Sequence, residues 1–377
     1  MNKHKQTNLG SGLLGSFKMS EFAIRYSEFV PRFYNLTQSL GFTTDKIMPS
    51  RAFCSDESQG YPIILIAKHF GTFPFNHGGV GGVMSNDRHG PHAHHGDDLA
   101  IIHASHVGYD PELGQYGHYR RLQTTNRQTT SSCGKICARL QWYLDEYTYA
   151  KEHIFLLKEK KQYYIIIDNL LLQSNRKQGL ILKVEQLIET SEDDHIEVLL
   201  NLSTSKKFKV CEKFKQKLQQ QNLAENKKTA IGDLLSAELF SFKNHSNDRI
   251  DINLIDAMSF IVCSQWPALT AAQVNIQVEF DQAYRSIIKE PEYQNKNLLF
   301  ISGLNVDISP EKGQLFPLTK FIPWAAYYQN KLGQHETWEQ QELYDRLMNE
   351  SVHNPDQINL EDAIGIMRKK QEIILPF

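Results

Sequence analysis

The hydrophobic pattern of the chain begins with a helical period over residues 20–45. Apolar side chains recur there at the spacing of a helix face, at Phe22, Ile24, Phe29, Val30, Phe33, Leu36 and Leu40. This spacing predicts an amphipathic helix, and Gly41 is a residue type at which helices commonly end.

Four short apolar runs predict strands, and they cover residues 47–53, 63–67, 99–104 and 297–303. The first and third of these runs are followed at once by polar side chains that can bind a metal ion. Because ligands bind beyond the carboxyl ends of strands in open α/β sheets, we expect the chemistry at these two strand ends.

The remainder of the chain is more polar. A helical pattern runs from Cys133 to Leu144, and residues 145–250 are rich in lysine and glutamine. We interpret residues 145–250 as a charged elaboration within one domain that spans residues 20–330. A charged helical tail is expected over residues 331–377, with its helical pattern starting near Glu336.

Composition narrows the classes of function. The formal net charge of −2 gives no basic surface of the kind that binds nucleic acid. No apolar run approaches the roughly 20 residues that cross a bilayer, and residues 1–20 lack the apolar core of a secretory signal. We therefore expect a cytoplasmic protein with no nucleic-acid partner and no membrane span. Five cysteines in 377 residues do not form a disulfide framework, which favours metal binding or catalysis.

Residues with metal-binding chemistry gather in three places. Cys54 follows the first predicted strand, His103 and His106 follow a later one, and Cys133 opens a predicted helix. Zinc accepts thiolate and imidazole ligands in a tetrahedral site, and a catalytic site keeps one position open for water. The positive end of a helix also lowers the pKa of a thiol placed there. A zinc site built from cysteine and histidine fits this pattern.

The residues alone leave alternatives open. Cys54 and Cys133 could equally be small buried hydrophobic residues. Strand alternation places His103 and His106 on opposite faces, and we prefer His106 because it lies nearer the loop. Cys137 lies one helical turn after Cys133 and could face the same side, although a position in the helix core is expected.

Three further features receive other interpretations. Residues 90–95 could form a second, histidine-rich metal site, although a flexible surface loop is the commoner case. The glycines of residues 78–82 do not form a phosphate loop, because no Lys-Ser or Lys-Thr pair follows them. Cys211 and Cys263 lie among apolar residues and are expected in the core.

An ordered series of short motifs resembles the limiting-carbon-dioxide-inducible protein B/C family, which is related in fold and site to the β-carbonic anhydrases. The motifs are C-S-D-E (54–57), F-P-F (73–75), H-H-G-D-D (94–98), S-H-V-G (105–108), the pair Arg120 and Arg121, S-S-C-G (131–134), S-G-L-N-V (302–306) and L-F-P (315–317). The likeness is dense from about residue 45 to residue 140, and the order of the motifs carries it.

The resemblance implies an α/β fold with a central, mostly parallel β-sheet flanked by helices. It implies zinc (Zn2+) on Cys54, His106 and Cys133, with Asp56 as the carboxylate beside the metal. The implied activity is the reversible hydration of carbon dioxide to bicarbonate by a zinc-activated water, since zinc lowers the pKa of bound water towards ~7. A homodimer is expected from the resemblance alone.

Two departures from the β-carbonic anhydrase pattern affect this interpretation. Those enzymes place an arginine two residues after the aspartate, where this chain has Ser58, and their second cysteine three residues after the histidine, where it has Tyr109. The family that this chain resembles takes its second cysteine from further along, which fits Cys133. We expect the missing arginine to be Arg121 or its neighbour Arg120.

Other residues complete the expected site. His94 or His95 is expected to carry protons to solvent, because imidazole titrates near neutrality. Phe73, Phe75 and Val80 could line an apolar wall for a nonpolar substrate, although a core position is the commoner role for any one of them.

Two other classes of function stay open. The first is a catalytically silent relative whose zinc is structural and which works as a binding or assembly module. The second is a zinc hydrolase that acts on a larger substrate through the histidine-rich loop. Access to the fourth position on the metal separates the enzyme from the silent relative.

Overall fold

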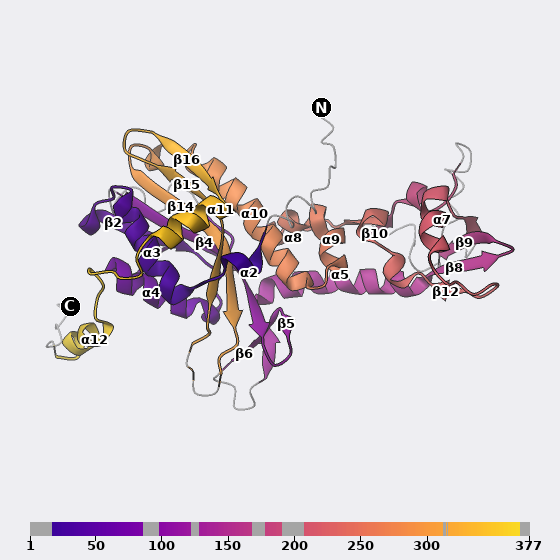
Figure 1. Cartoon of the computed structure of the whole chain (residues 1–377), viewed down its shortest axis with the longest axis horizontal. Helices are drawn as coiled ribbons and strands as arrows, with labels where there is room; N and C mark the ends of the chain where they lie inside the picture. Colours follow the sequence, from indigo (N-terminus) through magenta and orange to yellow (C-terminus); the bar gives the residue numbers. More distant parts are fainter. Residues whose placement is uncertain are drawn as a thin grey trace, which may run out of the picture. The chain divides into compact units, whose positions relative to one another are not determined.

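An eight-stranded β-sheet organises the part of the chain that carries the predicted site. The computed structural model describes residues 17–85, 98–121, 128–167, 178–190, 207–311, 314 and 316–369. The chain divides into two compact units (Figure 1). The sheet unit consists of Ser11–Ile136 and Ala272–Phe377, and the inserted unit contains Cys137–Ala271.

The strands of the large sheet lie in the order β1-β15-β14-β4-β2-β3, with β16 paired to β15 and β5 paired to β4. The four neighbours β14, β4, β2 and β3 are parallel, and the other pairings are antiparallel. Their bounds are β1 (Ile24–Arg25), β2 (Ile47–Ala52), β3 (Phe75–Asn76), β4 (Asp98–Asp110), β5 (Gln115–Tyr116), β14 (Asn297–Ile308), β15 (Lys320–Gln329) and β16 (His335–Glu339). The expected α/β fold with a mostly parallel central sheet is confirmed.

Helices cover both faces of this sheet. On one face, α3 (Tyr26–Ser39), α4 (Gly60–Phe70) and α11 (Gln340–Asn349) pack on alternate strand residues such as Ile102. On the other face, α10 (Pro267–Ile287) packs on the residues between them, such as Ile101. Strands buried on both faces are continuously apolar rather than alternating, which explains the runs in β4 and β14.

Two local predictions were wrong. Residues 63–67 were expected to form a strand, but they lie inside α4, because a short apolar run does not distinguish a buried helix from a buried strand. The tail was expected to be helical from near Glu336, but β16 occupies His335–Glu339 and the helix begins at Gln340. The helical period near the N-terminus corresponds to α3, preceded by β1 and by α2 (Met19–Phe22).

The inserted unit has a smaller antiparallel architecture. Its four-stranded sheet has the order β11-β9-β8-β12, and β10 pairs with β13. The bounds are α5 (Gly134–His153, which starts in the sheet unit), β8 (Ile154–Glu159), β9 (Gln162–Ile167), β10 (Gly179–Leu182), β11 (Lys207–Lys209), α7 (Glu212–Gln219), β12 (Thr229–Ala230), β13 (Phe240–Lys243), α8 (Arg249–Leu254) and α9 (Met258–Cys263). The part of residues 145–250 that the structure describes belongs to this unit.

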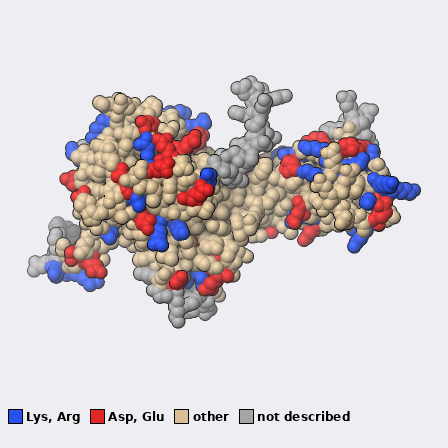
Figure 2. Space-filling view, viewed as in Figure 1, with Lys and Arg blue, Asp and Glu red and all other residues tan. Residues whose placement is uncertain are grey.

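Surface charge and helix length add two observations. Blue and red atoms are interspersed on the face drawn in Figure 2, and neither sign forms a broad field there. Among the described residues, no helix combines the length and the apolar character needed to cross a membrane.

The segment after α11 is held against α3 and α4 by polar contacts. The buried Asn354 donates its amide to the His69 carbonyl oxygen at 3.1 Å, and the same nitrogen lies 3.2 Å from His69 Nδ1. Tyr34 donates its hydroxyl to Asp356 at 2.8 Å. Burial, together with the nearby charge of Lys68, lowers the pKa of His69 to about 4. The neutral imidazole is therefore the form that this packing accommodates. Beyond this segment, α12 (Leu360–Lys369) has no buried residue.

We expect the free energy of unfolding to fall as the pH drops from about 6.5 to about 4. The unfolded chain binds a proton at its imidazole before the folded chain does, so stability is complete above the unfolded pKa and is lost towards the folded pKa. Over this window the His69 contribution should be on the order of 2–3 kcal/mol. Denaturant titrations at several pH values should show a shallower pH dependence for His69→Gln than for the parent. His335→Gln, an exposed change on β16, is the control, and equal slopes in parent and His69→Gln would contradict this account.

Candidate metal centre

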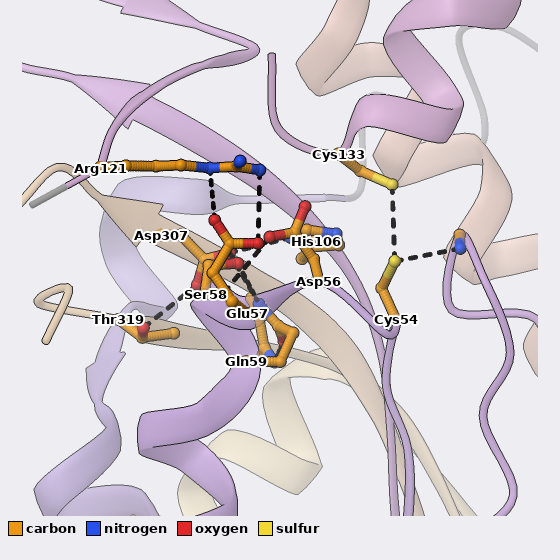
Figure 3. Close-up of polar contacts among 12 residues, drawn as sticks. Cys54, Asp56, Glu57, Ser58, Gln59, His106, Arg121, Cys133, Asp307 and Thr319 are labelled. Atoms are coloured by element: carbon orange, nitrogen blue, oxygen red, sulfur yellow. Dashed lines mark hydrogen bonds and ion pairs between the residues drawn. The ribbon is translucent and has the colours of Figure 1, made fainter. Parts of the chain in front are cut away.

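Three buried side chains meet at the carboxyl end of the parallel strands. Cys54 follows β2, His106 lies in β4, and Cys133 directly precedes α5. Their ligand atoms all lie within 4.8 Å of one another, and the two sulfurs are 3.8 Å apart (Figure 3). The parallel register places Ala52 beside His103, which brings the residues after β2 level with the following part of β4. The structure therefore brings together the three residues that the sequence singled out as metal ligands.

The donor set fits a zinc ion. His106 Nδ1 lies 2.9 Å from Asp307 Oδ2, whereas Nε2 is buried and has no hydrogen-bond partner among the described residues. A buried ring nitrogen without a hydrogen-bond partner, beside two thiols, has the environment of a metal ligand. Two sulfurs and one imidazole nitrogen also leave one tetrahedral position free.

The protonation of the cluster agrees with a cation site. A hydrogen bond from the Cys133 thiol lowers the pKa of Cys54 to about 4, and the same hydrogen bond, together with burial, raises the pKa of Cys133. Burial alone would lower the pKa of His106, but Cys133 and Asp307 outweigh it and raise that pKa well above its usual value. The negative charge that raises the pKa of His106 is the charge that a cation bound between the thiols and the imidazole would neutralise.

Asp307, at the end of β14, orients the histidine. Its Oδ2 also accepts hydrogen bonds from Ser58 Oγ at 2.8 Å and from Gln59 Nε2 at 2.7 Å, and its Oδ1 accepts one from Thr319 Oγ1 at 3.1 Å. Because His106 is in register with Asn305, two residues before Asp307, these side chains share one face of the sheet. A carboxylate on the second ring nitrogen fixes the tautomer and orientation of a metal-binding histidine.

Sequence reasoning missed Asp307, although one signal was present. Within the apolar strand β14, the polar residues Asn305 and Asp307 stand two positions apart, and both are fully buried. Such buried polar residues need partners, so their alternation inside an apolar run indicated a polar contact on one face of the sheet.

The glycine-rich loop at residues 78–82 covers Cys54. The Gly81 nitrogen donates to Cys54 Sγ at 3.1 Å. A side chain at Gly78 would place its Cβ 2.2 Å from the Phe53 carbonyl oxygen, so only glycine allows the loop this close to the end of β2. The loop therefore supplies a backbone hydrogen bond to a thiolate.

Helix α10 holds this loop from the opposite face of the sheet. Asn275 Nδ2 donates to Ser105 Oγ at 2.7 Å and to the Gly81 carbonyl oxygen at 3.4 Å. One turn later, Glu279 Oε2 accepts a hydrogen bond from the Met84 nitrogen at 3.1 Å. Both side chains are fully buried, so the loop conformation over Cys54 depends on polar contacts from α10.

Two carboxylates and an arginine lie beside the metal-ligand cluster. Asp56 accepts a hydrogen bond from the Ser58 nitrogen at 3.3 Å, and Arg121 forms an ion pair with Glu57, with Nη2 3.3 Å from Oε2 (Figure 3). Burial and a hydrogen bond with Asp56 raise the pKa of Glu57, and Arg121 opposes this rise. Arg121 therefore reaches the Asp56 neighbourhood through Glu57. Arg120 pairs instead with Asp110, at 3.2 Å, and with Glu112.

Tyr119 belongs to the same neighbourhood and was also missed. It lies in β6 (His118–Arg120), which pairs with β7 (Thr129–Ser131) just before Cys133. Burial raises the pKa of Tyr119, and the negative charges of Asp307, Glu57 and Asp56 raise it further. A neutral phenol among carboxylates is a hydrogen-bond donor for an anion or for water.

The other expected residues lie elsewhere. His103 bonds Ser302 Oγ at 3.0 Å and the Gly82 carbonyl oxygen at 3.1 Å, on the face opposite His106. Cys137 is not part of the three-residue cluster found among the described residues. Phe73 and Val80 are 73% and 58% exposed, so neither is in the core, and Phe75 is half-buried. His94, His95 and the histidine-rich loop lie outside the described residues.

Comparison with known proteins agrees with the resemblance found in the sequence. The family described as limiting CO2-inducible proteins B/C beta carbonic anhydrases matches residues 23–212, half of the chain. The chain is similar to the crystal structure of PtLCIB4, a homolog of the limiting CO2-inducible protein LCIB, with 12% identity and a TM-score of 0.50 over 87% of this chain and 98% of that one. A crystal structure of LCIB itself matches at 12% identity and a TM-score of 0.42, over 88% and 99% of the two chains. No curated protein matches.

We expect Asp307→Asn to weaken metal binding by about 10–100-fold, because the amide no longer fixes the charge and orientation of His106. Competition with a chromophoric chelator measures this affinity without reference to any activity. Asp281→Asn, an exposed change on α10 at an ion pair with Arg285, is the matched control and should bind metal like the parent. Parent-like affinity in Asp307→Asn would show that this carboxylate does not act on the site.

Proposed function

The chain belongs to the limiting-CO2-inducible protein B/C family, and from this we propose that it catalyses the reversible hydration of carbon dioxide to bicarbonate. The proposed cofactor is zinc, held by Cys54, His106 and Cys133. The observation that carries the proposal is the convergence of these ligand atoms within 4.8 Å in a buried cluster.

The donor chemistry supports zinc over harder cations. Thiolate and imidazole are ligands that zinc prefers, whereas magnesium and calcium select oxygen. When bound at such a site, zinc activates water as a nucleophile near neutral pH. Three protein ligands, rather than four, are typical of a catalytic site.

The surrounding residues have roles that follow from their positions. Asp56, two residues after Cys54, would accept a hydrogen bond from the attacking water and so direct its lone pair at the substrate. Arg121 would keep Asp56 in place through Glu57, the carboxylate that it contacts. Tyr119 would donate a hydrogen bond to an oxygen of bicarbonate. His95 lies outside the described residues and remains our proposed proton carrier to solvent on the basis of the sequence alone.

One observation favours a second candidate, a catalytically silent relative with structural zinc. Ser58 occupies the position of the arginine that holds the aspartate in β-carbonic anhydrases, and its hydroxyl is committed to Asp307 at 2.8 Å. The Ser58 side chain therefore serves the histidine, and Asp56 receives only a hydrogen bond from the Ser58 backbone nitrogen, at 3.3 Å. If Arg121 does not replace the lost guanidinium, Asp56 is free to close the site.

We expect one zinc per chain, lost on changing Cys54, His106 or Cys133 singly. The sharpest variant is Cys133→Ser, because a neutral hydroxyl is a poor substitute for a thiolate ligand. Metal analysis after gel filtration should find zinc in Cys137→Ser, the matched control one helical turn away, and almost none in Cys133→Ser. Full zinc in Cys133→Ser would remove this cysteine from the ligand set.

We expect Asp56→Asn to keep its zinc and its hydration rate to fall by a factor of about 10²–10⁴. The reason is that the asparagine amide can donate a hydrogen bond and so orient the water wrongly. A stopped-flow assay with a pH indicator measures hydration, and metal analysis of the same sample separates chemistry from metal loss. Asp281→Asn again serves as the control. A fully zinc-loaded parent without hydration activity from about pH 7 to 9 would reject the enzyme and leave the structural-zinc candidate.

A further inference from the structure

A cavity of about 500 Å³ lies at the edge of the sheet formed by β1 and β15. Its lining includes Arg25, Lys320, Tyr26, Ser27, Tyr61 and Leu318. The volume falls in the range of small-molecule sites. Thr319 also borders the cavity, and its hydroxyl bonds Asp307, so the cavity is separated from the metal-ligand cluster by that carboxylate.

Two cations face each other across the strands at this cavity. Antiparallel pairing places Arg25 directly opposite Lys320. Like charges at opposed positions destabilise a sheet. In the ranges that the structure describes, neither side chain forms an ion pair or a hydrogen bond. This unfavourable pair is explained if an anion neutralises it.

The N-terminus of one helix borders the same cavity. Helix α3 begins at Tyr26 and no side chain caps its N-terminus, although the Tyr26 nitrogen donates to the Thr319 carbonyl oxygen at 3.1 Å. Such an end carries a partial positive charge. Tyr26 is 1% exposed, and its phenol oxygen, which lies near the Asn305 amide, meets no partner in hydrogen-bonding geometry among the described residues. That hydroxyl lies in the core, where the Tyr26 ring packs on Phe53 and Phe321, so the anion-binding groups described at the cavity are the two cations and the start of α3.

The rest of the lining is apolar. Leu318 is 50% exposed, and the Tyr61 ring stacks on Phe316 with centroids 5.6 Å apart. An inorganic anion would leave this wall bare, whereas an anion with an apolar body would cover it. Arginine matches the two oxygens of a carboxylate or a phosphate equally well.

We infer that this cavity binds an organic oxyanion, a carboxylate or a phosphate monoester, whose charge pairs with Arg25 and Lys320 and whose apolar body lies on Leu318 and Tyr61. The site needs neither a metal ion nor the proposed hydration activity.

Isothermal titration of the full chain with benzoate and with phenyl phosphate tests the site, and benzamide is the neutral control. We expect saturable 1:1 binding of at least one anion, and the tighter of the two identifies the class of oxyanion. Arg25→Gln and Lys320→Gln should each weaken it by about tenfold, and the double variant should abolish it. Arg285→Gln, which removes an exposed arginine from α10, should bind like the parent.

Thermal melting of the same variants separates binding from folding. Because the two cations repel each other, the double variant should melt at the parent temperature or above it. A lower melting temperature would show that the cations stabilise the fold, and this would overturn the inference. Equal binding of benzamide and benzoate, unchanged binding in the double variant, or no saturable binding of either anion would also overturn it.

Discussion

The carboxylate of Asp307 is fully buried and contacts Nδ1 of His106. It also accepts hydrogen bonds from three other side chains. Burying a charge is costly unless its partners are complete, so the arrangement of β14, β15 and the start of α4 around Asp307 is tightly constrained. Because this carboxylate binds Nδ1 of His106, the nitrogen that remains for a metal is Nε2. The positions of the other site residues are consistent with a ligand at Nε2.

The thiolate side of the cluster is held by a different means. Gly81 donates a backbone hydrogen bond to Cys54, and Asn275 and Glu279 fix the loop that carries it. The histidine is thus oriented from one face of the sheet and the cysteine from the other. The residues that hold His106 and Cys54 in place come partly from residues 275–319. The others come from the segment of the chain that carries the ligands. The family match ends at residue 212, before any of the supports from Asn275 onward.

The sequence predicted those site residues that belong to a scarce residue type or that follow the alternation of a strand. Cys54 and Cys133 stood out because cysteine is scarce here, and strand alternation separated His106 from His103. The strand predicted at residues 63–67 failed because five apolar residues have no readable period in a buried environment. Asp307 and Tyr119 were missed because their roles depend on partners that only the folded sheet brings near. The hydrogen bond from His106 to Asp307 spans 201 residues.

That span has a consequence for synthesis of the chain. A ribosome completes Cys54, His106 and Cys133 well before β14 is made, so for much of translation the two thiols exist without the strand that orients their histidine. Contacts so distant in sequence form late, because the loop between them must be closed first. During that interval the nascent chain presents reactive sulfur to oxidants and to any thiol-seeking metal. If the cluster binds a metal, selective loading would therefore depend on how the cell handles an unfinished chain, and not only on the affinity of the finished one.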